Sequence, residues 1–157
     1  MRFVATTFAI STLAVSTLTF SLSCARAFAI DDRVPDPQAM AALMAKADQA
    51  QPKEQCFLYA ELVHEMTELA GQQYSSGDDD HASATLQLVQ KYAEKIHMGV
   101  AADGKKMKNA EELMRHTSFR LAGILSAASY EDRQVLQATL KQLEQVQTEL
   151  MMQVFKK

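Results

Sequence analysis

The stretch that decides the fold is residues 53–74, KEQCFLYAELVHEMTELAGQQY. Apolar side chains recur in it at the three- and four-residue spacing of an α-helix, and glutamate and glutamine occupy most of the positions between them. One face of this helix is therefore apolar and the opposite face is polar. The apolar stripe consists of Cys56, Tyr59, Leu62, Val63, Met66, Leu69 and Ala70. The segment predicts an amphipathic helix that buries one face against other helices.

The same spacing continues on both sides of this stretch. It predicts further helices at about residues 37–50, 81–101 and 105–128, and a last one from 129 nearly to the C-terminus. Asp36 before Pro37 is typical of a helix start, because aspartate caps free N–H groups and proline lacks the N–H that the first turn would leave unpaired. Ser129 with Asp132 indicates a second capped start. Steps of four and three along the last helix predict a coiled-coil seam with one polar position, formed by Leu136, Leu140, Leu143, Gln147, Leu150 and Val154.

These patterns predict an all-α protein, in the form of an antiparallel up-down four-helix bundle with a short additional N-terminal helix. Only a few residues separate the long helices, and short connections favour antiparallel neighbours. A tandem array of helical repeats is the alternative, but no self-similarity of the required period is present. We expect the bundle at residues 36–157, after a short leader at residues 30–35.

The first 29 residues have the pattern of a cleavable signal peptide. Arg2 precedes an uncharged stretch, residues 3–22, and Ala27 and Ala29 are the small residues that a signal peptidase requires. We therefore expect a periplasmic or secreted protein that begins at Ile30 and has no transmembrane segment after cleavage. An uncleaved membrane anchor is one alternative. Lipid attachment through Cys24 is another, although the usual leucine three positions before it is replaced by serine.

The part of the chain after the signal is acidic. Loss of Arg2 and Arg26 reduces the basic residues from 16 to 14, against 19 acidic residues, which gives a net charge of −5. Nucleic-acid binding needs a basic surface, so we expect no nucleic-acid partner. Cys56 is the one cysteine that remains, and its place on the apolar stripe predicts a buried thiol.

Two Glu-x-x-His steps, Glu61 to His64 and Glu94 to His97, are the candidate metal ligands. Di-iron bundles use this step on two helices, with all ligands pointing inward. Here both glutamates lie far from the apolar stripes of their helices and are expected to face water. The sequence therefore predicts no metal site. A copper- or zinc-binding protein that uses His and Met is the alternative, but most methionines lie on apolar stripes and are explained as core residues.

No motif in the chain supplies a catalytic group or holds a cofactor. There is no nucleophile beside a plausible base, no glycine-rich phosphate loop and no Cys-x-x-Cys pair. Phe57 and Phe119, in contrast, lie on the polar faces of their helices, which makes them a candidate surface for a protein partner or for self-association. We expect a non-enzymatic interaction, scaffolding or chaperone-like module without a cofactor.

Overall fold

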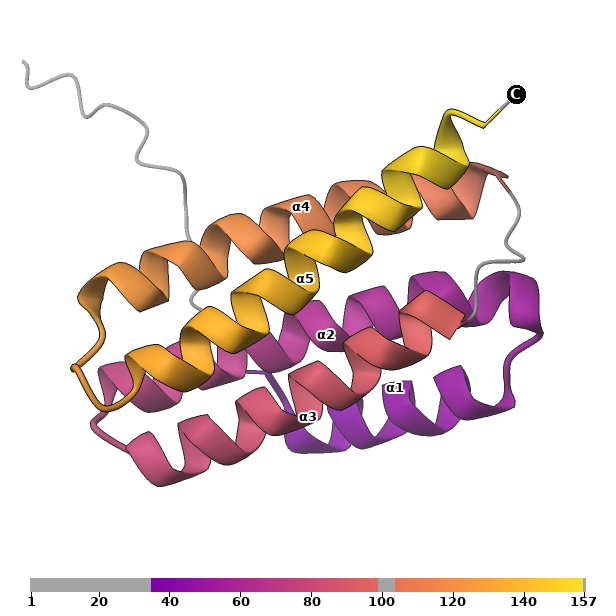
Figure 1. Ribbon diagram of the computed structural model, residues 1–157. Coiled ribbons are helices and arrows are strands. Elements are labelled where there is room, and N and C mark those ends of the chain that lie inside the picture. The colour runs from indigo at the N-terminus through magenta and orange to yellow at the C-terminus, as the bar shows by residue number, and fades with distance from the viewer. Residues whose placement is uncertain (1–34, 99–103, 157) are drawn as a thin grey trace, which may run out of the picture. The chain divides into compact units, whose positions relative to one another are not determined.

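The computed structural model describes residues 35–98 and 104–156, except for the side chains of residues 97, 98, 104 and 105. In this part of the chain every regular element is an α-helix (Figure 1). The helices are α1 (Pro37–Gln49), α2 (Pro52–Ser75), α3 (Asp79–Met98), α4 (Gly104–Ala127) and α5 (Arg133–Val154). The predicted all-α class is confirmed, and the expected helices are present with ends that differ by a few residues. The signal peptide, the leader up to residue 34 and Cys24 lie outside the described residues.

Local chemistry explains where the helices begin. The Asp36 side chain accepts a hydrogen bond of 3.0 Å from the backbone N–H of Gln38, as expected for the residue that caps α1. Before α5, the backbone N–H of Asp132 donates to Ser129 Oγ at 3.3 Å, which is the capping contact that the sequence predicts. Regular helix nevertheless starts only at Arg133, after a turn.

The helices pack in a closed ring of four. α2 packs against α3 and α4, and α5 packs against the same two helices; α1 packs against α2 from outside this ring. No other pair of helices within the described residues has backbones in contact. α3 and α4 are consecutive in the chain and yet are not neighbours, so they occupy opposite corners of the ring.

This arrangement corrects the expectation that all neighbouring helices are antiparallel. Contacts between α2 and α4 keep a nearly constant offset in residue number: Glu54 meets Lys106, His64 meets Thr117, and Glu68 meets Arg120. A constant offset means that the two helices run in the same direction, as Figure 1 also shows. Short connections determine the direction of consecutive helices, but they do not determine which helices become neighbours.

The core lies between the four ring helices and extends under α1. Its largest fully buried side chains include Leu62, Met66, Leu86, Met114 and Leu143. Met107 is also buried, and Met40 and Met44 of α1 pack partly buried against the core. These methionines therefore serve as apolar packing residues, as the sequence predicts.

The buried face of α5 differs in part from the predicted seam. Leu136, Leu143 and Leu150 are buried as expected, but Leu140, Gln147 and Val154 are only partly buried. Thr139 and Val146 take the inner positions instead. Thr139 is fully buried, and its hydroxyl is satisfied there because it donates to Val135 O at 2.8 Å and accepts from Gln90 Nε2 of α3 at 2.7 Å. The polar position of the seam is thus Thr139 rather than Gln147.

None of the described helices has the length and apolar composition needed to cross a membrane.

Candidate functional site

A groove of about 350 Å³ lies between α2 and α4. Its walls combine apolar, acidic and other polar side chains, namely Phe57, Glu61, Asn109, Glu112, Leu113 and His116. Two of these residues come from α2 and four from α4, so the groove exists only because the helices pack side by side. Because the two helices are parallel, residues about 52 positions apart face each other along its length.

Polar contacts close the interface between α2 and α4 on both sides of the groove. Lys106 Nζ is 2.6 Å from Glu54 Oε1 at one end. At the other end, His64 Nδ1 is 3.0 Å from Thr117 Oγ1, and Arg120 Nε is 3.0 Å from Glu68 Oε2. The groove residues Glu61, Asn109, Glu112 and His116, by contrast, have no hydrogen bond or ion pair with another described residue.

Glu61 is more enclosed than the sequence predicts. It was expected to face water, but it is partly buried, and this desolvation raises the pKa of its carboxyl. The positive charge of Lys46 opposes this rise in pKa, the negative charge of Glu65 adds to it, and the positive charge of Lys106 opposes it. The physical reason is that α2 packs against three helices, so its polar face is narrower than that of a helix with two neighbours.

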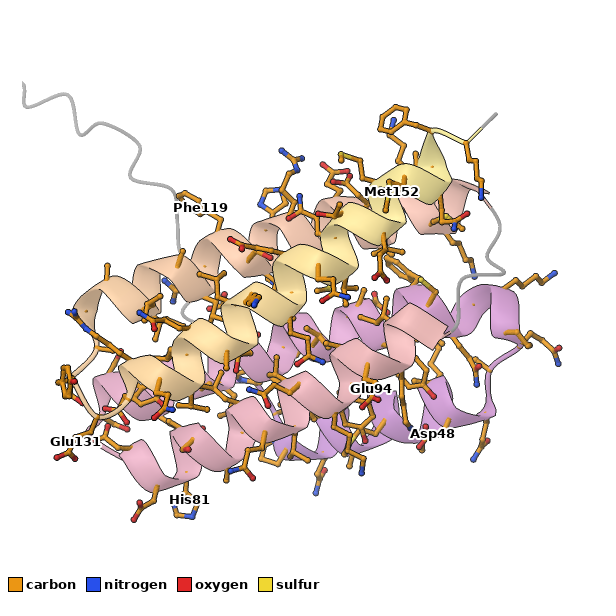
Figure 2. All side chains as sticks on the ribbon, viewed as in Figure 1. Asp48, His81, Glu94, Phe119, Glu131 and Met152 are labelled. Atoms are coloured by element: carbon orange, nitrogen blue, oxygen red, sulfur yellow. The ribbon has the colours of Figure 1, made fainter. Side chains whose placement is uncertain are left out.

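Phe57 and Phe119 differ in their exposure. Phe57 is partly buried and packs against the core from the wall of the groove, so the expectation that it is a misplaced surface residue needs correction. Phe119 has 82% of its surface exposed and projects outward from α4 (Figure 2). It lies three residues after His116 and therefore on the same face of α4. Phe119 does not line the groove itself, and the groove together with the neighbouring Phe119 ring is here called the α2/α4 face.

The candidate metal ligands are not brought together in the described residues. Glu94 is exposed on α3, whereas His64 lies between α2 and α4, and the side chain of His97 is outside the described part. Thr117 donates its hydroxyl hydrogen to Leu113 O at 2.8 Å, so its oxygen accepts from an N–H at His64 Nδ1. Within residues 35–98 and 104–156, no group of three or more His, Cys, Asp or Glu side chains is placed to hold a metal ion.

A polar and aromatic cluster that the apolar periodicity does not predict joins α1 to α2 and α3. Lys95 Nζ lies 2.8 Å from Asp48 Oδ1 and 5.0 Å from the ring centres of both Tyr59 and Tyr92. The Tyr59 hydroxyl donates to Asp48 Oδ1 at 2.9 Å. These four residues are called the Asp48 cluster below. The periodicity places Tyr59 on an apolar stripe. The one signal of the cluster in the sequence is the phenol hydroxyl of this residue, which needs a hydrogen-bond partner when it is buried.

No protein-family model, curated protein or solved structure matches this chain. The class of protein is therefore defined by the fold alone, as an all-helical bundle.

Proposed function

We propose that this chain is an exported helical-bundle module that binds another protein through its α2/α4 face. The observation that carries the proposal is the exposure of Phe119, 82% of whose surface faces solvent beside a groove whose polar side chains have no hydrogen bond or ion pair to another described residue. A phenylalanine ring offers a large apolar area to a partner, and aromatic residues are frequent among those that dominate binding energy. The adjacent carboxylates and imidazole would supply polar contacts at the rim.

The scaffold of this module is proposed to be a four-helix bundle of α2 to α5, with α1 as the additional N-terminal helix. The closed ring of contacts supports this proposal. Helix directions alternate along the chain, and α2 and α4 are parallel neighbours. The α2/α4 face then consists of two long helices held in register by Glu54–Lys106 and Glu68–Arg120, which favours a surface that changes little on binding.

Site-specific crosslinking tests the interaction. A photo-reactive amino acid in place of Phe119 should give a discrete covalent adduct when the protein is expressed in its own cells. The same amino acid in place of Gln137, which is exposed on α5, is the matched control. An adduct at position 119 and none at 137 supports the proposal. Adducts of equal yield at positions 119 and 137 contradict it. The absence of an adduct at position 119, when the photo-reactive group is shown to be active in the purified protein, also contradicts it.

Export is proposed from the signal-peptide pattern of residues 1–29. The mature protein is expected to begin at or near Ile30, and intact mass together with N-terminal sequencing of the exported protein measures this. A mass that matches the full precursor contradicts cleavage. Detection of a lipid on Cys24 would show that the protein is anchored to a membrane and is not a free periplasmic or secreted protein.

A further inference from the structure

We infer that α1 opens away from the bundle as a unit while α2 to α5 stay folded, and that the Asp48 cluster controls how often it opens. This property concerns the side of the molecule formed by α1, α2 and α3, and it does not depend on the proposed binding face between α2 and α4. α1 would then act as a removable cover over the paired rings of Tyr59 and Tyr92.

The first argument is that α1 is attached less extensively than the other helices. Ala47 is its single buried residue, whereas α2 has ten. α1 is 13 residues long, and an isolated helix of that length is marginal in water. Its helical state therefore depends on docking. The four ring helices contact one another without α1, so they keep their mutual contacts when it leaves.

The second argument is the nature of the contacts that hold α1. The apolar contacts are those of the buried Ala47 and of partly buried residues of α1. The polar contacts among the described residues are the bonds of the Asp48 cluster and a hydrogen bond of 3.2 Å from the Tyr92 hydroxyl to Met44 Sδ. The side chains of Asp48 and Lys95 are 51% and 32% exposed. A partly exposed ion pair is weakened by dissolved salt and contributes modestly, so it can be broken without unfolding the core.

The third argument is the junction between α1 and α2. Ala50 and Gln51 are extended, with ψ angles of 159° and 145°, and Pro52 is the first residue of α2. Proline disfavours helical geometry in the residue before it, so α1 and α2 cannot fuse into one helix. The two helices are thus independent hydrogen-bonded units. Rotation about the extended residues moves α1 without breaking the helical hydrogen bonds of α2.

Hydrogen–deuterium exchange of the full chain, read by mass spectrometry, tests the inference. Peptides from α1 should exchange faster than peptides from α2 and α5. Asp48→Asn should speed exchange of α1 by about two- to fivefold and leave α5 unchanged, because it weakens one partly exposed ion pair. Glu94→Gln is the matched control, since it removes the same charge from an exposed residue beside Lys95 that has no bond to α1.

Salt provides an independent measurement on the same proteins. Raising the concentration of sodium chloride should speed exchange of α1 in the wild-type protein and in Glu94→Gln, and should have less effect in Asp48→Asn, where the ion pair is already absent. Exchange of α1 at the same rate as α5 in the wild-type protein would overturn the inference. So would an Asp48→Asn variant in which all helices accelerate alike, or in which α1 does not change.

Discussion

At the scale of single residues, burial decides which side chains are chemically available. Cys56 is fully buried, and desolvation raises the pKa of its thiol to about 11. The thiolate is the reactive form, so we expect a thiol reagent at pH 8 to label the native protein very slowly and the protein in denaturant at once. The rate of labelling measures this directly. Rapid labelling of the native protein would contradict the expectation that the apolar stripe of α2 faces the core.

His81 illustrates how a neighbour changes an exposed group. Its Nδ1 lies 2.6 Å from Asp78 Oδ1, and this hydrogen bond, with the negative charge of the same carboxylate, raises the pKa of the imidazole. The raised pKa means that the pair contributes stability below the pKa of the unfolded state, about 6.5, and loses it as the pH rises through the folded value. Asp78→Asn should lower the pKa of His81 in an NMR titration. Glu94→Gln, which removes a distant charge from the same helix, should not.

At the scale of helices, α2 and α4 approach each other closely at Gly71. A Cβ atom added to Gly71 would lie 2.9 Å from Ile124 Cδ1, so an alanine there requires that side chain to move. Ile124→Val removes this methyl group. The helix propensity of alanine would by itself stabilise α2 by up to about 1 kcal/mol.

A double-mutant cycle on Gly71 and Ile124 tests the contact. Gly71→Ala alone should be nearly neutral, because clash and propensity oppose each other. In the Ile124→Val background it should stabilise by about 0.5–1 kcal/mol. Gly123→Ala is the control for propensity, since a Cβ there meets nothing within 4 Å. Urea denaturation measures each free energy of unfolding. Additive effects in the cycle would show that the helices are not in contact at this point.

At the scale of the whole molecule, stability depends on the core shared by the ring helices. Leu143 is fully buried in the middle of α5, so Leu143→Ala should lower the free energy of unfolding by about 2–5 kcal/mol. A domain of this size has about 5–15 kcal/mol in total, and the shift in urea midpoint should be plain. Gln137→Ala, at an exposed position of the same helix, should change the free energy by at most about 0.5 kcal/mol. Similar values for both variants would mean that α5 packs with a different face.

The order, number and approximate ends of the helices in the described part were predictable from the sequence. They depend on contacts within a few residues, such as the cap at Asp36 and the period of apolar residues in α2. The burial of Cys56 and the exposure of Phe119 follow from the same periodicity. Periodicity identifies the face of a helix, and that is sufficient when the face is clearly apolar or clearly polar.

Only the tertiary structure decided which helices are neighbours. Side-chain contacts such as Glu68–Arg120 and the close approach at Gly71 make α2 and α4 parallel neighbours, and these contacts join residues about 50 positions apart. A pattern along one helix contains no information about them. Packing between helices also explains three other features. It encloses Glu61, it places Thr139 instead of Gln147 in the seam, and it assembles the Asp48 cluster from three helices. Each of these features depends on the identity of the partner helix, which is determined when the core packs as a whole.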